Sequence, residues 1–221
     1  MKISKSTGFS SIKRWYHEKQ LLAVVKSLRR KEFSAYYFPT IASVNRYLLK
    51  TIPKSATVGI PGSVTVRELS IIGKLRKRGN TIIHHWKVGQ TEEKSRGDRL
   101  KEAHADYYLT STNAITTDGD IINIDGIGNR VAAMIYGPSN VLIIAGRNKI
   151  VPSIEAGIKR SRNIAAVMNA KRVGAKTPCV QTGICIDCDA KKRICRVISI
   201  IQYRPLHTNI SVMLVNKELG F

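Results

Sequence analysis

The chain has 221 residues, 43% of them hydrophobic, and its 37 lysines and arginines outnumber 15 aspartates and glutamates, for a formal net charge of +22. This length and hydrophobic content suit one α/β domain over residues 1–221 better than two small ones. No run of eighteen apolar residues occurs, and residues 2–14 are basic and polar, so we expect no membrane span, no secretory leader and a cytoplasmic location.

The N-terminal part, residues 1–54, is predicted to be mainly helical, and a β-loop-α-β unit is predicted to follow it. Hydrophobic spacing, helix stop signals and turn residues define these elements. In chain order they are a helix at 13–31, a strand at 35–38, a helix at 41–52, a strand at 57–60, a helix at 66–78 and a strand at 81–86.

The second half of the chain continues to alternate helices and strands. The expected elements are a helix at 92–104, a strand at 106–111, a hairpin of 114–116 with 121–124, an apolar piece at 131–136, a buried strand at 140–145, a helix at 153–172, and strands at 197–203 and 210–215. Strands that alternate with crossover helices are typical of an α/β fold with a mostly parallel sheet and helices on both faces.

All four cysteines, Cys179, Cys185, Cys188 and Cys195, fall within residues 176–196. Cytoplasmic thiols stay reduced, so clustered cysteines there indicate a metal centre more than disulfides. The spacing C-x5-C-x2-C-x6-C has one close pair flanked by lone cysteines, whereas structural zinc usually takes two C-x2-C pairs. The pattern therefore favours an iron–sulfur cluster of the 4Fe-4S type, with zinc or no metal as the alternatives.

Charged residues surround this motif. Lys191, Lys192 and Arg193 lie between the third and fourth cysteines, where positive charge offsets the negative charge of a thiolate-bound centre. The alternative for these three residues is an exposed, solvated loop. Asp187 and Asp189 flank the third cysteine, and we interpret both as surface acids outside the thiol pattern.

A loop of small residues, 59–65, connects a predicted strand to a predicted helix. Backbone N–H groups at such a helix start favour an anion, which makes Ser63 a candidate ligand. The alternative is that Ser63 only caps the helix. Neither a Walker loop nor a G-x-G-x-x-G dinucleotide fingerprint is present.

The glycine-rich segment after the predicted hairpin is dense in polar residues. Its glycines let backbone approach a ligand closely, and Asn113, Asp125, Asn129 and Arg130 are candidates to surround a small carboxylate. Arginine can hold a carboxylate with two parallel hydrogen bonds. The alternative is a hairpin and turn that satisfy themselves, with Asp125 paired to Arg130.

Two other positions attract attention because of their side chains. Lys149 follows the predicted strand at 140–145, where open α/β sheets bind ligands, and is a candidate anion ligand. His84 and His85 are adjacent in a predicted strand, so their side chains should point to opposite faces of the sheet. They therefore cannot bind one ion, and we interpret both as structural.

The excess of positive charge leaves an anionic partner open. Basic residues form short clusters separated by ordinary globular sequence, at 26–31, 74–78, 159–162 and 191–193. A nucleic-acid binder should gather basic residues on one face with aromatic groups among them, and aromatic residues make up only 6% of the chain. Two interpretations of the basic clusters therefore stay open: they bind nucleic acid, or they are solvated helix faces.

Several stretches resemble the lactate utilisation (LUD domain) family, in its small stand-alone branch with a C-terminal four-cysteine motif. They are PGSVTVREL, STNAITTDGDIINIDGIGNRVAAMIYGP, NVLIIAGRNKIV, TPCVQTGICIDC with the following RIC, and VMLVNKELGF, which cover about residues 55–221. The resemblance implies the fold of the superfamily of ribose-5-phosphate isomerase, glucosamine-phosphate isomerase, CoA transferases and 5-formyltetrahydrofolate cyclo-ligase. It also implies a link to oxidation of lactate to pyruvate together with iron–sulfur subunits.

The sequence departs from the family pattern in one place, the loop at 59–65 between the predicted strand at 57–60 and the predicted helix. Where the family resemblance implies paired glycines before the serine, this chain has Pro61-Gly62-Ser63. Proline has no backbone N–H, so one donor for an anion is lost. The missing donor makes the prediction of phosphate or CoA binding at this loop weaker.

The leading hypothesis is a LUD-type iron–sulfur protein in the redox metabolism of a small 2-hydroxy carboxylic acid such as lactate, with an electron-transfer or iron–sulfur subunit as partner. The acid is expected in a strand-end pocket of Ser63, Asn113, Asp125, Asn129, Arg130 and Lys149. A second hypothesis is a zinc-stabilised basic module that binds nucleic acid or an acidic partner. A third is a metal-independent isomerase or acyl-transfer enzyme that uses the pocket alone.

Overall fold

The computed structural model describes residues 8–221, so the first seven residues of the predicted N-terminal part lie outside the described residues. The helices are α1 (Phe9–Arg30), α2 (Ile41–Thr51), α3 (Val64–Glu68), α4 (Ile71–Lys77), α5 (Glu92–Ala103), α6 (Asn129–Ile135), α7 (Ile154–Arg160), α8 (Val167–Arg172) and α9 (Pro178–Thr182). A 3-10 turn, η1 (Arg147–Lys149), and a π-helical segment, η2 (Ser161–Ala166), complete the helical elements described. No helix within residues 8–221 is both long and apolar enough to cross a bilayer.

Ten strands in the described residues form two sheets. They are β1 (Ser34–Phe38), β2 (Thr57–Gly59), β3 (Thr81–Ile83), β4 (Tyr107–Ser111), β5 (Ala114–Thr116), β6 (Ile121–Asp125), β7 (Asn140–Gly146), β8 (Ile150–Val151), β9 (Val197–Ile201) and β10 (Asn209–Val215). The larger sheet has the order β1-β10-β7-β4-β2-β3, and all its neighbouring strands are parallel.

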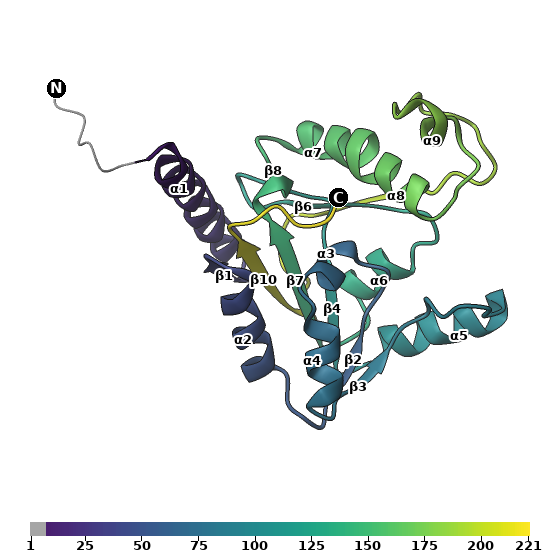
Figure 1. Cartoon of the computed structure of the whole chain (residues 1–221), viewed down its shortest axis with the longest axis horizontal. Helices are drawn as coiled ribbons and strands as arrows, with labels where there is room; N and C mark the ends of the chain where they lie inside the picture. Colours follow the sequence, from purple (N-terminus) through teal and green to yellow (C-terminus); the bar gives the residue numbers. More distant parts are fainter. Residues whose placement is uncertain (1–7) are drawn as a thin grey trace.

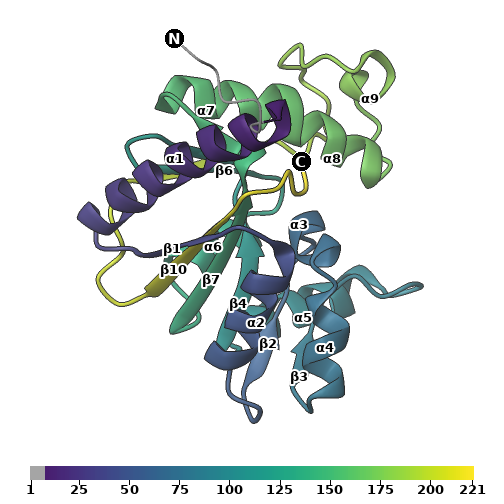
Figure 2. The same cartoon turned by 60° about the vertical axis from the view of Figure 1, so that its left-hand side comes forward.

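The smaller sheet has the order β8-β5-β6-β9. Here β6 runs antiparallel to β5 and β9, while β5 and β8 are parallel. In both views the helical run α7–α8 and the short helix α9 lie at the end of the molecule away from α4 and β3 (Figures 1 and 2). The predicted mostly parallel α/β sheet is confirmed, and the smaller, mixed sheet is an addition that the sequence did not indicate.

Side chains of the central strand β7 alternate between two hydrophobic cores. Val141, Ile143 and Ala145 pack on one face of the larger sheet with α1, α6 and residues of the smaller sheet. Leu142 and Ile144 pack on the other face with α2, α3 and α4. Because successive strand residues point to opposite faces, one continuous apolar strand supplies both cores. The predicted helices on both faces are confirmed.

The predicted single helix at 66–78 is wrong. The helix begins earlier, at Val64, because the Ser63 side chain accepts a hydrogen bond from Val66 N at 3.3 Å and caps it. It then breaks at Ser70, whose φ of 53° lies in the left-handed region that interrupts an α-helix. Two short helices, α3 and α4, therefore replace the predicted one, and α3 is free to sit at the edge of the strand ends.

Three other predicted elements agree with the structure to different degrees. The apolar piece at 131–136 belongs to a helix, α6. The predicted helix at 153–172 has the expected extent, and Ser153 Oγ caps it by accepting a hydrogen bond from Ala156 N, but its middle third is π-helical. The hairpin of β5 and β6 is confirmed, with Gly119 at a φ of 93° in its turn.

Candidate functional site

Residues that follow the carboxyl ends of β2, β4 and β7 border a cavity of about 370 Å³. All six residues that the sequence predicted for a pocket line this cavity. They come from the loop before α3, the turn after β4, the end of β6, the start of α6 and η1, and are Ser63, Asn113, Asp125, Asn129, Arg130 and Lys149. The location agrees with the rule that open α/β sheets bind ligands at strand carboxyl ends. Their role in holding a carboxylate stays a prediction.

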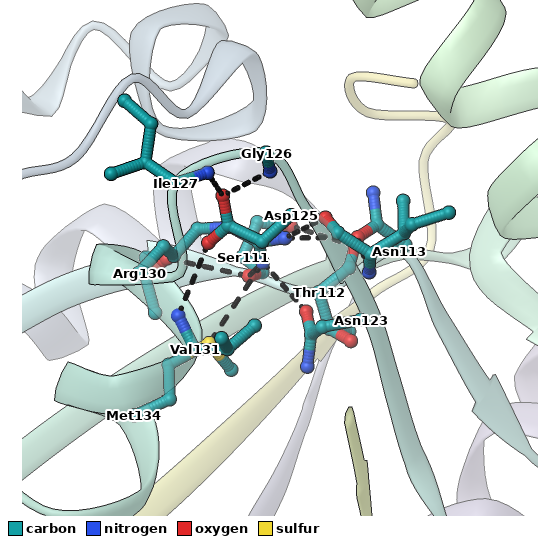
Figure 3. Close-up of polar contacts among 12 residues, drawn as sticks. Ser111, Thr112, Asn113, Asn123, Asp125, Gly126, Ile127, Arg130, Val131 and Met134 are labelled. Atoms are coloured by element: carbon teal, nitrogen blue, oxygen red, sulfur yellow. Dashed lines mark hydrogen bonds and ion pairs between the residues drawn. The ribbon is translucent and has the colours of Figure 1, made fainter. Parts of the chain in front are cut away.

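Arg130 is the centre of a hydrogen-bond network in the cavity wall (Figure 3). Its two terminal nitrogens donate to Ser111 O at 3.2 Å, Asn123 Oδ1 at 2.6 Å, Asn113 Oδ1 at 3.0 Å and Ile124 O at 2.8 Å. Hydrogen bonds from a charged donor are roughly twice as strong as neutral ones. Arg130 therefore ties the end of β4 to β6 and fixes the side chain of Asn113 at the cavity.

Asp125 organises the turn between β6 and α6 (Figure 3). Its Oδ1 accepts from Gly126 N at 2.7 Å and Ile127 N at 3.4 Å, and its Oδ2 accepts from Val131 N at 3.3 Å. Arg130 Nε lies 4.0 Å from Asp125 Oδ2. The self-satisfied turn that the sequence left as an alternative is thus present. Asp125 is also the one acidic side chain among the described residues that line the cavity.

Lys149 is buried, with 3% of its surface exposed, although it lines the cavity. Its Nζ donates to Thr112 O at 2.9 Å and to the backbone oxygen of Phe221 at 2.7 Å. Burial, followed by the charges of Arg160 and Arg130, lowers the pKa of Lys149 to about 7. An anionic ligand would favour the charged form, so Lys149 is able to take up a proton when such a ligand binds.

The cavity wall contains further basic side chains that the sequence did not single out. Arg99 of α5 and Arg172 of α8 line it, and Arg172 Nε donates to Asn169 Oδ1 at 2.8 Å. Burial and the nearby charge of Arg67 lower the pKa of Arg172. Arg99 is also paired with Glu92, with Nη1 2.7 Å from Glu92 Oε1. Nearby positive charge favours the ionised form of a carboxylate. No local pattern in the sequence indicated these residues, because their elements meet only in the folded chain.

His84 and His85 have different surroundings. His84 stacks on Trp86 with ring centroids 3.9 Å apart, and its Nε2 lies 2.8 Å from an Arg76 nitrogen. His85 lines the cavity, and its Nδ1 lies 2.7 Å from Glu102 Oε1. The strand β3 ends at Ile83, so the pleated-strand argument that predicted opposite faces does not apply to this pair.

All four cysteines are free, partly buried and line one second cavity. Cys179 is carried by α9, which begins with proline and ends at Gly183 with a φ of 72°. Cys185 and Cys188 follow in a loop, and Cys195 precedes β9. The sequence predicted that these thiols converge, and the fold brings them to one space. Their binding of a metal stays a prediction.

Arg193 holds the cysteine segment together. It donates to Cys195 Sγ at 3.3 Å, to Cys188 O at 2.7 Å and to Asp187 Oδ1 at 2.7 Å. Arg162 reaches the same carboxylate, with Nη1 2.9 Å from Asp187 Oδ2. The hydrogen bonds from Arg193 and then Arg162 lower the pKa of Asp187. Asp187 is exposed, as expected of a surface acid, and it also positions the arginine that contacts the thiols.

The donor set fits a thiolate-bound centre chemically, since sulfur is the preferred ligand of iron–sulfur clusters and a common ligand of zinc. A tetrahedral zinc with Zn–S bonds of about 2.3 Å would bring the sulfurs to roughly 3.8 Å of each other. Within residues 8–221, no three histidine, cysteine, aspartate or glutamate side chains are close enough for one ion. The cavity that the thiols line has a volume of about 20 Å³.

The two cavities share a wall. Ala166, at the end of η2, and Ile194, before the fourth cysteine, line both of them. Gly126 lies against the same segment, since a Cβ atom there would approach the Ile194 backbone to 3.1 Å. Ala166 and Ile194 therefore border both the cysteine cavity and the polar cavity.

Comparison with known proteins identifies the family. The model of the LUD domain matches residues 21–215. The chain belongs to the LUD domain family. In fold it is similar to a DUF162 family protein from Deinococcus radiodurans, with 13% identity, a TM-score of 0.51, and coverage of 90% of this chain and 98% of that chain. None of the curated proteins matches the chain.

The LUD match includes both parts of the candidate site. Residues 21–215 contain every predicted pocket residue, from Ser63 to Lys149, and all four cysteines, from Cys179 to Cys195. The segment 216–221 falls outside the match but contributes Phe221 to the polar cavity. The family resemblance stated from the sequence motifs is confirmed, and so is the α/β fold that it implied.

Proposed function

We propose that this LUD-family protein holds an iron–sulfur cluster on Cys179, Cys185, Cys188 and Cys195. In this proposal it acts in the redox metabolism of a small 2-hydroxy carboxylic acid such as lactate, bound in the adjoining polar cavity. The observation that carries the proposal is the shared wall: four thiols line one cavity, and Ala166 and Ile194 separate that cavity from the predicted substrate pocket.

The charge of the polar cavity supports an acidic substrate. Arg99, Arg130, Lys149 and Arg172 line the cavity with one acidic side chain, Asp125. A small carboxylate gains from such surroundings, because nearby positive charge favours its ionised form. Arg130 is held by hydrogen bonds, so it contributes positive charge and shape to the cavity wall. Lys149 can take up a proton and become charged when the acid binds.

The cysteine segment supports a redox centre through Arg193. A bound cluster would supply one-electron transfer, or an open iron as a Lewis acid. Hydrogen bonds to the coordinating sulfurs and the nearby charge are protein contributions that tune such a centre. Arg193 provides both, because its guanidinium contacts Cys195 Sγ and Asp187 holds it there.

Anaerobic purification followed by iron and acid-labile sulfide analysis tests the proposal. We expect a brown protein with broad visible absorption that changes when lactate is added. Colourless protein without iron contradicts the iron–sulfur assignment. Stoichiometric zinc without iron supports the zinc-stabilised alternative. Full enzymatic activity in Cys188→Ala protein supports the metal-independent isomerase or acyl-transfer alternative.

A further inference from the structure

Glu102 is a completely buried carboxylate that serves one histidine. It lies in the last turn of α5 and has 0% of its surface exposed. Its Oε1 accepts from the backbone N of His85 at 2.6 Å and lies 2.7 Å from His85 Nδ1. The carboxylate therefore fixes both the backbone and the imidazole ring of His85.

This arrangement is costly for the fold. Burying a carboxylate requires partners that compensate for lost water, and a buried ion pair is often no more stabilising than apolar side chains of similar size. Among residues 8–221, His85 is the one basic residue paired with Glu102, and Glu102 Oε2 is buried without a hydrogen bond. The chain has only 15 acids, yet it buries this one completely to orient a histidine. A role for the histidine beyond packing follows.

Residues on either side pack closely around Glu102 and His85. Gly59 in β2 lies so close to α5 that a Cβ atom would come within 2.2 Å of the Glu102 carbonyl oxygen. On the other side of His85, Trp86 Nε1 donates to Ile60 O at 3.2 Å. The histidine is thus held between the helix behind it and the anchored tryptophan after it.

The ring geometry determines what His85 can do. An ionised carboxylate only accepts hydrogen bonds, so the proton of the neutral ring lies on Nδ1, facing Glu102. Nε2 then carries the lone pair, and none of the described residues donates a hydrogen bond to it. Since His85 lines the polar cavity, Nε2 is the nitrogen left for a ligand. Orientation of a catalytic imidazole by a carboxylate on its other nitrogen is a general device for proton transfer.

We propose that His85 is the proton acceptor of this cavity and takes the proton of the hydroxyl group on the bound 2-hydroxy acid. The inference rests on the proposed function for its substrate. In the step, the O–H bond of the substrate breaks, an N–H bond forms at Nε2, and the negative charge stays on the substrate oxygen. Glu102 stabilises the resulting imidazolium, and the basic side chains of the wall, Arg99 and Arg172 among them, favour the anionic oxygen.

Binding measurements test hydroxyl recognition without any turnover. Calorimetry with lactate and with propionate, which lacks the hydroxyl, gives the preference of the wild-type protein for the hydroxyl group. We expect His85→Phe to reduce that preference about tenfold while leaving propionate affinity unchanged, because one hydrogen bond is lost. The matched control is His84→Phe, which changes the neighbouring histidine that does not line the cavity.

The outcomes separate the two proposals. If wild-type protein binds neither acid, the proposed function fails. If it prefers lactate and His85→Phe keeps that preference, as His84→Phe does, the role of His85 is refuted while the function stands. Equal binding of lactate and propionate to wild-type protein also refutes the role of His85.

Chemical rescue tests the proton-transfer step. Under anaerobic conditions, lactate-dependent reduction of ferricenium should fall about a hundredfold in His85→Ala protein. Added imidazole should restore much of the rate in His85→Ala and none in Glu102→Ala, where the histidine is present but no longer oriented. A rate in His85→Ala that matches wild type, or a loss that imidazole does not restore in folded protein, overturns the assignment.

Discussion

The two cavities share a wall but are built in opposite ways. Side chains of the polar cavity follow strands of both sheets and hold one another through the Arg130 network, so its shape exists before any ligand binds. The cysteine cavity is formed by a short helix and a loop, and its thiols are not within coordination distance of a single ion. One region is preorganised by the strands, whereas the other, under the proposal of a metal centre, would be completed only when the metal binds.

The largest expected effect is on the cysteine cavity alone. Cys188→Ser should lower bound iron by about tenfold or more, because a cluster of this type takes four thiolates. Thermal unfolding of the sheet followed by circular dichroism should change little. Ile184→Ser, at an exposed residue in the same loop, is the matched control and should retain iron. Unfolding of the whole domain in iron-free protein would break the comparison.

Next is the polar cavity. Arg130→Met removes a charged donor from four oxygens, two of them backbone carbonyls at strand ends, and should destabilise the fold by about 3 kcal/mol. Urea unfolding measures this change. Arg172→Met lines the same cavity but loses one side-chain bond, to Asn169, and should stay close to wild type. Equal effects of both substitutions would argue against a preorganised network.

A smaller effect is expected at Arg193, which connects the cysteine segment to the exposed carboxylate of Asp187. Arg193→Lys keeps a positive charge but cannot bridge Cys195, Cys188 and Asp187 at once. We expect an iron chelator to remove the cluster about tenfold faster than from wild type, as for other residues that support metal ligands. Lys192→Met, which removes a charge from the same stretch, is the control. Faster loss in that control as well would assign the effect to charge alone.

A further prediction concerns the pH dependence of stability. Burial lowers the pKa of Lys149 to about 7, against about 10.4 for a lysine in water. Between these values the unfolded chain binds more protons than the folded one, so the contribution of Lys149 to stability rises with pH across that window. The urea midpoint of Lys149→Met protein should rise less between pH 7 and about 10 than that of wild type. Parallel curves would contradict the lowered pKa.

Much of this architecture was predictable because it follows from local patterns. The alternation of helices and strands indicated the parallel sheet, and residues placed after predicted strands, such as Asn113 and Lys149, line the strand-end cavity. Serine before a helix gave the caps at Ser63 and Ser153. Cysteine spacing indicated the convergence of the thiols.

The remaining features depend on contacts between distant parts of the chain. Ser70 breaks a helix without a glycine or proline to signal it. His85 was interpreted as structural because it was placed in a strand that ends two residues earlier, and its partner Glu102 comes from another helix. Arg130 was a candidate carboxylate ligand, with a turn that satisfies itself as the alternative, and the sequence did not indicate its partners in the folded hairpin and β4.

The π-helical segment η2 joins α7 to α8 in the helical run labelled in Figure 1, and it sets the rotation of α8 relative to α7. Ala166 within it belongs to both walls, and Asn169 and Arg172, one and two turns later, line the polar cavity. Successive residues of an α-helix are rotated by about 100°. Deleting a single residue from η2 would therefore turn the α8 side chains away from the strand ends while leaving α7 against the smaller sheet. The wide turn fixes the angular phase between the half of this helix that packs on the smaller sheet and the half that borders the polar cavity.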